Sequence, residues 1–407
     1  MTFSPVLEKI LKSDLCTGCG LCASLAPLSL HMALDATGFA RPVVTAKVPK
    51  DIDEKIEALC PGRNIVQEPS STGDHVLWGP IQVCRTGYAT DTDLRQHASS
   101  GGVISALLAY LLASKTVDYV IQVGASPTSP LDNLTVVSAT AENVYDAAGS
   151  RYAPSSPLAD MHRHLAGPGR FALVGKPCDI AAMRAMARTD PRVDQKIPVM
   201  ISFFCAGVPS RRGTEKILRA MQVEEKDVVD FRYRGDGWPG FATARKADGS
   251  EGRMSYADSW GNILSKHVQF RCKICPDGSG GLADIVCGDA WESDAHGYPA
   301  FAERDGQSLM LSRTVRGEDL VRKALAAGVI VGEELDVSRI ALMQPSQAFR
   351  KKMVLARLAA MAVALRSVPN YRNLNLLKAA LAGGVLQNLK NFLGLLKRFF
   401  VGSRRPS

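Results

Sequence analysis

Cysteine is the residue that most constrains this sequence. The chain has 407 residues and ten cysteines, eight of which fall into two sets of four. The first set is Cys16-Thr-Gly-Cys19-Gly-Leu-Cys22, to which Cys60, followed by Pro61, adds a fourth thiol. Thiolates at this spacing in a glycine-containing turn can bind one cluster while backbone amides donate to its sulfides. The set predicts a 4Fe-4S cluster, and the alternatives are a tetrahedral zinc site or simple buried thiols.

The fourth ligand of this set departs from a contiguous ferredoxin sequence. Such a sequence would place its last cysteine just before Pro27, and the chain has Ala26 there. Cys60 is the substitute that we expect, because the proline after it keeps the ligand out of a helix interior.

The second set of cysteines is dispersed. Cys178 and Cys205 each follow a short apolar run typical of a buried strand, and Cys272 and Cys275 form a close pair. Open α/β sheets bind ligands at the ends of such strands. A single cysteine there is as often a packed apolar residue, but four that converge predict a second 4Fe-4S cluster. Two cysteines stay unassigned and are expected to be structural: Cys84 and Cys287.

The length and composition are those of a folded protein of several domains. The chain exceeds the usual size of one domain, with 46% hydrophobic and 22% charged residues. Its start contains no uninterrupted apolar core of signal-peptide length, which predicts a cytoplasmic location. Thiols are kept reduced there, so the cysteines indicate metal or redox chemistry and not disulfides.

Positive charge is concentrated near the C-terminus. The formal net charge is +9, and the basic residues of the last part of the chain are barely opposed by acids. No nucleic-acid motif accompanies them, so the expected partner is an acidic protein, a polyanionic cofactor or an anionic membrane surface. Beyond Pro369, apolar residues recur at helical spacing opposite a basic face. This helix is expected to pack on the body or on a partner subunit, or to lie peripherally on a membrane, since it is too short to span one.

The apolar pattern predicts a mixed α/β fold in three parts. Residues 1–75 are expected to form a small ferredoxin-like module with little regular structure, residues 76–340 an α/β domain, and residues 341–407 a helical, basic tail. Within the second part the pattern predicts a buried helix at 103–112 and strands at 117–123, 134–138, 171–175 and 197–204.

These motifs together resemble the beta-subunit family of coenzyme F420 hydrogenases and dehydrogenases, which includes reductases of chlorophyll intermediates. The resemblance implies an iron–sulfur flavoprotein with FAD beside one or two 4Fe-4S clusters. It implies electron transfer between ferredoxin or coenzyme F420 and a small organic substrate. The alternative is a non-catalytic electron-transfer subunit of a hydrogenase or formate-dehydrogenase-like complex. The matching stretches are Cys16–Cys22, Ser99–Gly102, Gly149–Tyr152, Gly175–Ile180, Phe203–Gly207 and Cys272–Asp289.

The same stretches supply candidate flavin-binding residues. Ser100, Gly101 and Gly102 precede a helix, so their amides can take the FAD pyrophosphate at its positive end, although Gly-Gly before a helix is also an ordinary turn. Arg151 and Lys176 are candidate phosphate partners, or surface charges. The other predicted cofactor-binding residues are Ser99, Ser150, Tyr152, Gly175 and Asp289, the last of which equally suits the cap of a turn.

His97 is the predicted catalytic residue. It lies just before the Ser-Gly-Gly turn, and histidine titrates near neutrality, so it can supply a proton. The alternative is a hydrogen-bonded structural histidine.

Overall fold

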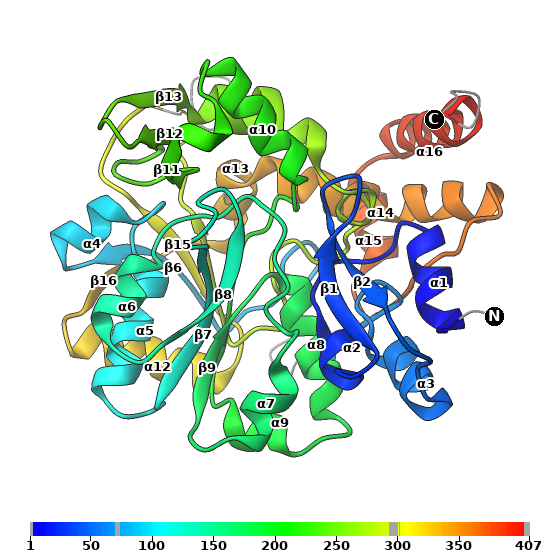
Figure 1. Ribbon diagram of the computed structural model, residues 1–407, viewed down its shortest axis with the longest axis horizontal. Coiled ribbons are helices and arrows are strands. Elements are labelled where there is room, and N and C mark those ends of the chain that lie inside the picture. Colours follow the sequence, from blue (N-terminus) through cyan, green and yellow to red (C-terminus); the bar gives the residue numbers. More distant parts are fainter. Residues whose placement is uncertain (1–2, 70–73, 293–299, 301, 403–407) are drawn as a thin grey trace.

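The computed structural model describes residues 3–69, 74–292, 300 and 302–402. Its centre is an eight-stranded mixed sheet (Figure 1). In sheet order the strands are β16 (Ile330–Glu334), β6 (Val83–Ala89), β15 (Ser308–Ser312), β14 (Ile285–Asp289), β10 (Met200–Phe203), β9 (Phe171–Val174), β7 (Tyr119–Ala125) and β8 (Asn133–Ser138). The four strands from β14 to β7 run parallel, and antiparallel strands complete both edges.

Helices cover both faces of this sheet. Successive residues of β9 alternate between two cores, with Ala172 and Val174 in one and Phe171 and Leu173 in the other, because side chains alternate along a strand. The expected α/β fold is confirmed, and the predicted helix and strands are present. The helices are α5 (Val103–Ala113), α6 (Ala141–Asp146) and α12 (Val315–Ala326) on one face, and α7 (Met161–Ala166), α8 (Pro177–Ala187) and α9 (Arg192–Lys196) on the other.

A smaller layer, which we call the cap (residues 211–267), lies beyond the ends of the main-sheet strands (Figure 1). Its antiparallel sheet shares a core with its helix through Ile217, Phe231 and Ala242. Its elements are α10 (Arg211–Ala220), η1 (Glu225–Asp227), β11 (Val228–Arg232), β12 (Phe241–Lys246), β13 (Glu251–Ser255), η2 (Ala257–Ile263) and η3 (Leu264–His267).

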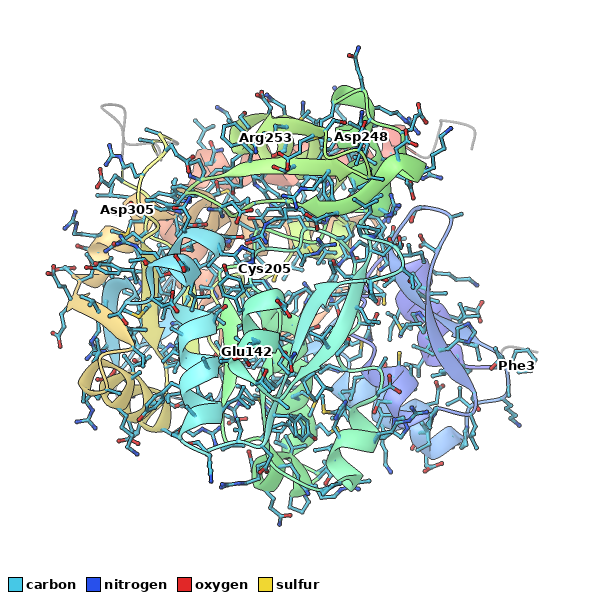
Figure 2. All side chains as sticks on the ribbon, turned by 60° about the vertical axis from the view of Figure 1, so that its left-hand side comes forward. Phe3, Glu142, Cys205, Asp248, Arg253 and Asp305 are labelled. Atoms are coloured by element: carbon cyan, nitrogen blue, oxygen red, sulfur yellow. The ribbon has the colours of Figure 1, made fainter. Side chains whose placement is uncertain are left out.

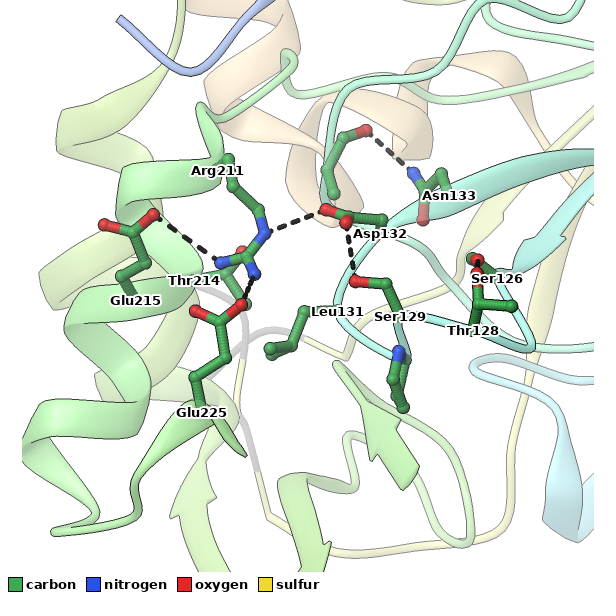
Figure 3. Close-up of polar contacts among 12 residues, drawn as sticks. Ser126, Thr128, Ser129, Leu131, Asp132, Asn133, Arg211, Thr214, Glu215 and Glu225 are labelled. Atoms are coloured by element: carbon green, nitrogen blue, oxygen red, sulfur yellow. Dashed lines mark hydrogen bonds and ion pairs between the residues drawn. The ribbon is translucent and has the colours of Figure 1, made fainter. Parts of the chain in front are cut away.

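Arg211, the first residue of α10, ties the cap to the main sheet (Figure 3). Its Nε donates to Oδ1 of Asp132, in the loop between β7 and β8, at 2.8 Å. The same guanidinium pairs with Glu225 and lies 3.7 Å from Glu215. Arg211 is buried, and three carboxylates compensate the cost of burying its charge.

The N-terminal module is more regular than the sequence indicated. The expectation of little regular structure for this part is wrong, because its elements are too short to show a periodicity. A tight turn at Gly38, with φ of +81°, closes a hairpin between its first two strands. The elements are α1 (Pro5–Lys12), α2 (Leu21–Leu25), β1 (Leu30–Leu34), β2 (Ala40–Val44), α3 (Lys50–Leu59) and β3 (Asn64–Val66).

The C-terminal segment returns to this module. Leu7, Ile10, Val354, Leu358 and Leu395 share one hydrophobic core, and a short strand near the C-terminus pairs in parallel with β3. The predicted helical stripe is two helices, because Gly383 and Gly384 interrupt it. The elements are α13 (Ile340–Met343), α14 (Pro345–Val363), β17 (Asn370–Arg372), α15 (Leu376–Ala382) and α16 (Val385–Gly402).

Shorter elements connect these layers: α4 (Thr92–His97), α11 (Phe270–Lys273), η4 (Val337–Arg339) and the paired strands β4 (Asp74–His75) and β5 (Gly79–Pro80). Among the described residues, no helix combines the length and the apolar character needed to cross a bilayer.

Candidate functional site

The four N-terminal cysteines, which we call the outer quartet, line one small cavity of about 30 Å³. Cys16 and Cys19 lie in the loop before α2, Cys22 is in its first turn, and Cys60 follows α3. Burial raises the pKa of Cys19 to about 12 and that of Cys60 to about 11, and the nearby cysteines add to both shifts. The four predicted ligands therefore share one buried space.

Two glycines let the loop of the outer quartet turn. Gly18 and Gly20 have φ values of +79° and +90°, in the left-handed region that other residues adopt at a cost. A Cβ atom on Gly20 would lie 2.9 Å from the backbone nitrogen of Ala159. Position 20 therefore requires glycine for both conformation and space.

The dispersed cysteines also converge, and we call them the inner quartet. Cys178 is in the first turn of α8, Cys205 follows β10, and Cys272 and Cys275 lie in and just after α11. Burial raises the pKa of Cys205 to about 12, with Cys272 and Cys275 adding to the shift. Burial likewise raises the pKa of Cys178, to which Cys205 and Cys272 also contribute.

Gln269 connects the two quartets. Its Nε2 donates to the carbonyl of Thr17, inside the outer loop, at 3.2 Å and to Sγ of Cys272 at 3.6 Å. Arg41 donates to Oε1 of Gln269 at 3.0 Å, which orients the amide. A second bridge joins the two quartets, because Arg271, the neighbour of Cys272, donates at 2.6 Å to the carbonyl of Pro61, the neighbour of Cys60.

Both quartets fit a four-iron cluster in the number and type of their ligands, because each cluster takes four cysteine thiolates. Within the part of the chain that the structure describes, no three His, Cys, Asp or Glu side chains surround a single metal-ion position. The four thiolates of a 4Fe-4S cluster need not surround one point, because each binds its own iron atom.

A cavity of about 270 Å³ opens between the main sheet and the cap. Cys205 of the inner quartet lines it, and Figure 2 shows this cysteine below the cap residues Arg253 and Asp248. Gly101 is outside the lining and donates its N–H to Oγ of Ser308 at 3.0 Å. The other predicted cofactor-binding residues all line the cavity: Ser99, Ser100, Gly102, Ser150, Arg151, Tyr152, Gly175, Lys176 and Asp289.

The Ser-Gly-Gly turn brings the N-terminus of α5 to this cavity. Gly102 precedes the helix with φ of +74°, and Val103, Ile104 and Ser105 of its first turn line the cavity. A Cβ atom on Gly101 would lie 2.8 Å from the carbonyl oxygen of Gly87, so this position requires glycine. The free amides at a helix start favour an anion.

Lys176 and Asp179 form a buried ion pair on the cavity wall. Their Nζ and Oδ2 atoms are 2.8 Å apart, and Nζ also donates to Oγ of Ser155 at 2.9 Å. Burial opposes the charge of Lys176, but Asp179 and Cys178 hold its pKa above the usual value. Oδ1 of Asp179 is buried without a hydrogen-bond partner among the described residues.

Arg151 joins the main sheet to the cap. The phosphate contact predicted for it competes with several bonds that its guanidinium already makes. The acceptors are Oδ1 of Asn133 at 2.9 Å and the carbonyl oxygens of Phe231 at 2.7 Å, Pro130 at 2.7 Å and Asp132 at 3.1 Å.

His97 does not line the cavity. Its Nδ1 lies 2.9 Å from Oδ1 of Asp236, and its Nε2 accepts from Arg232 at 3.0 Å. The ring stacks on Tyr145 at a centroid distance of 4.4 Å. Because arginine only donates, Nε2 has no proton to deliver. This geometry favours the structural alternative for His97.

Asp289 anchors a wall of the cavity that the sequence did not indicate. Its carboxylate receives two hydrogen bonds of 2.9 Å from Arg234 and one of 2.8 Å from Nε1 of Trp238. The buried guanidinium of Arg234 lies 4.6 Å from the ring centre of Tyr256 and 5.2 Å from that of Trp291. The glycine- and aromatic-rich sequence around Arg234 was the available signal.

Two family models match the chain. One, described as coenzyme F420 hydrogenase/dehydrogenase, beta subunit N-term, matches residues 84–162, and its C-terminus counterpart matches residues 169–338. Together they cover more than half of the sequence. The inner quartet lies within the second match, whereas the outer quartet precedes both.

Curated relatives show the same similarity. The chain is 27% identical over 277 residues to coenzyme F420 hydrogenase subunit beta of Methanococcus voltae, covering 64% of this chain and 86% of the relative. It is 22% identical over 324 residues to a subunit of the F(420)H(2) dehydrogenase of Methanosarcina mazei, covering 78% and 85%. It is also 22% identical over 265 residues to an F420-dependent formate dehydrogenase subunit beta of Methanocaldococcus jannaschii, covering 65% and 67%.

A solved structure shares the fold. A chain of the F420-reducing [NiFe] hydrogenase complex from Methanosarcina barkeri superposes with a TM-score of 0.53 at 23% identity. The match covers 70% of this chain and 95% of the other. At this identity the likeness is one of fold.

Proposed function

The chain belongs to the coenzyme F420 hydrogenase/dehydrogenase beta-subunit family, and we propose that it is an iron–sulfur flavoprotein oxidoreductase. It moves electrons between ferredoxin or coenzyme F420 and a small organic substrate, with two 4Fe-4S clusters and FAD as its cofactors. Residues 1–75 hold the outer cluster, residues 76–340 bind FAD and the inner cluster, and residues 341–407 form the basic helical tail.

One observation carries this proposal. Gln269 contacts both the outer loop and Cys272 of the inner quartet, and Cys205 of the inner quartet lines the cavity. Two thiol sets and a cavity in series match the layout of an electron relay. Short distances between successive sites are what such a relay requires.

The cavity suits an anionic flavin nucleotide. The start of α5 lines it, so its amides can bind the pyrophosphate. Lys176 also lines it, with its Nζ already paired with Asp179 and Ser155. The aromatic wall of Tyr256, Trp260 and Trp291 offers flat surfaces for a ring system. When bound, FAD exchanges single electrons for a hydride.

Anaerobic purification with iron, acid-labile sulfide and flavin measured per chain tests the cofactors. We expect about eight iron atoms, about eight sulfides and one flavin. Cys205→Ser should lose about half of the iron, whereas Cys84→Ser, at a buried cysteine of β6, should keep it all. A colourless protein, or one that holds zinc instead of iron, contradicts the proposal.

The electron partner is tested separately. The loaded protein is mixed with reduced ferredoxin or with reduced coenzyme F420, and flavin reduction is followed by absorbance. Rapid reduction by one carrier identifies the partner. Reduction by neither carrier contradicts this part of the proposal and leaves the cofactor measurement standing.

A second candidate is an electron-transfer subunit without a substrate of its own. The relatives favour it in part, because several are named as subunits of hydrogenases or formate dehydrogenases. Isolation of the protein from its own cells decides between the two. A stoichiometric large subunit supports the second candidate, and a lone chain that reduces a substrate supports the first.

A further inference from the structure

Helix α16 carries two adjoining sets of apolar residues. The side that packs on α14 and the N-terminal module contains Phe392, Leu395, Leu396 and Phe399. A second set is open to solvent and forms what we call the outer stripe: Leu386 (66% exposed), Leu389 (49%) and Leu393 (53%). Intervals of three and four residues place this set on one face of the helix. The first set is covered by the protein, whereas the second is exposed to solvent.

Lysines border the outer stripe. Lys390 and Lys397 are exposed and follow Leu386 and Leu393 by four residues, so each lies beside the stripe. The surrounding segment offers no compensating charge, because the sequence contains no Asp or Glu after Asp336. The outer stripe is therefore exposed to solvent within a segment whose charged residues are all basic.

This chemistry distinguishes between the surfaces that can cover the stripe. A second copy of the chain would bring another acid-free tail against the first, at an electrostatic cost. The core of a protein interface is depleted in lysine. At a lipid surface, by contrast, leucine side chains enter the acyl boundary, while lysine stems extend along them to the phosphates. We propose that α16 lies on the surface of a bilayer that contains anionic phospholipid and binds it through the outer stripe.

Attachment through α16 would hold the cysteine quartets near the bilayer. Leu395 and Cys16 share one core. The ring of Phe399 lies 5.8 Å from that of Phe270 in α11, the helix that contains Cys272. Figure 1 shows α16 at the edge of the molecule, away from the main sheet. The proposal rests on α16 itself and does not depend on the proposed redox function.

Co-sedimentation of the full-length protein with vesicles tests the proposal. One set of vesicles is phosphatidylcholine alone, and in the other phosphatidylglycerol replaces part of it. We expect sedimentation with the phosphatidylglycerol vesicles at low salt. Added salt should release the protein, because it screens the lysines from the lipid phosphates.

Two double variants separate the apolar and the charged contributions. Leu389→Gln with Leu393→Gln should weaken binding roughly tenfold or more for each leucine. Lys390→Gln with Lys397→Gln should weaken it roughly fivefold for each lysine at low salt. The matched control is Leu134→Gln with Val137→Gln on β8, where 49% and 52% exposed side chains lie outside the stripe. This control should bind as the wild type does. All four side chains of the stripe and control pairs are exposed, so thermal unfolding should change little.

Equal sedimentation with both kinds of vesicle would overturn the proposal, as would a stripe variant that binds like the wild type. A third outcome would assign the stripe to a second copy of the chain instead. In that case the wild type is dimeric and does not bind vesicles, and the stripe variant is monomeric.

Discussion

Gln269 donates a hydrogen bond from Nε2 to Sγ of Cys272 at 3.6 Å. The same nitrogen reaches the carbonyl of Thr17 in the loop of the outer quartet. One side chain thus contacts the two loops that hold the predicted clusters. It links them by hydrogen bonds, and it donates to one of the proposed ligand sulfurs.

The first prediction concerns the Gln269→Leu variant. A donor to a cluster thiolate stabilises the more negative, reduced state, so its loss should lower the potential of the inner cluster by tens of millivolts. Redox titration followed by EPR measures this shift. Gln195→Leu, on the exposed surface of α9, is the control. An unchanged potential in Gln269→Leu would show that the bond does not act on the cluster.

The second prediction concerns Asp289→Asn. The change leaves Arg234, which is 2% exposed, without its bidentate counter-ion. We expect the free energy of unfolding to fall by about 3 kcal/mol and flavin binding to weaken, as measured by urea unfolding and by flavin titration. The double variant with Arg234→Gln should recover part of the stability, because no buried charge remains. If the double variant loses as much free energy of unfolding as the two single variants together, this account is contradicted.

The third prediction compares Gly20→Ala with Gly249→Ala. The two glycines have similar positive φ values, +90° and +82°, so both variants incur a conformational cost of roughly 1–2 kcal/mol. Only Gly20→Ala also drives a methyl group onto the backbone of Ala159, since a Cβ at Gly249 has no atom within 4 Å. Gly20→Ala should therefore lose the iron of the outer quartet and keep that of the inner one. Iron loss in both variants would refute the steric explanation.

The fourth prediction concerns pH. Glu318 is largely buried, which works against its charge, yet hydrogen bonds from Arg85 and Ser312 hold its pKa below the usual value. Because its pKa is lower in the folded state, ionised Glu318 stabilises the fold at pH values above the unfolded-state pKa of about 4.3. This stabilisation is lost as the pH falls through the folded-state pKa.

Glu318→Gln should therefore cost about 2 kcal/mol at neutral pH. The difference in the free energy of unfolding between the variant and the wild type should shrink in acid. Urea unfolding at neutral pH and at acidic pH measures it. Glu333→Gln, on the edge strand β16, is the exposed control. A difference that is constant with pH would contradict the assignment.

The local pattern of apolar residues was sufficient to predict much of the fold. The apolar runs before Cys178 and Cys205 predicted β9 and β10, because fully buried parallel strands are recognisable from sequence. Their ends also predicted where the cysteines lie. Convergence of Cys272 and Cys275 on the same place depends on the path of the chain after the cap, which no local pattern encodes.

Side-chain direction was the main feature that the sequence could not supply. His97 is adjacent in sequence to the Ser-Gly-Gly turn, yet its ring points to Asp236 and Arg232. Arg234 lies in a glycine-rich stretch, and only the position of Asp289 across the cavity makes it a wall residue. The sequence predicted one helix beyond Pro369 where the structure has two, α15 and α16. The break at Gly383 and Gly384 was missed because the apolar spacing continues across them.

The central claim is that electrons reach the cavity through both quartets. Rapid mixing of anaerobic protein with reduced ferredoxin, followed at the flavin absorbance, tests it in the wild type, Cys19→Ser, Cys205→Ser and the Cys84→Ser control. Flavin content is measured first, so that only flavin-loaded protein is compared. We predict that flavin reduction slows by more than an order of magnitude in the Cys19 and Cys205 variants and is unchanged in the control. Reduction at the wild-type rate in Cys205→Ser would contradict the relay.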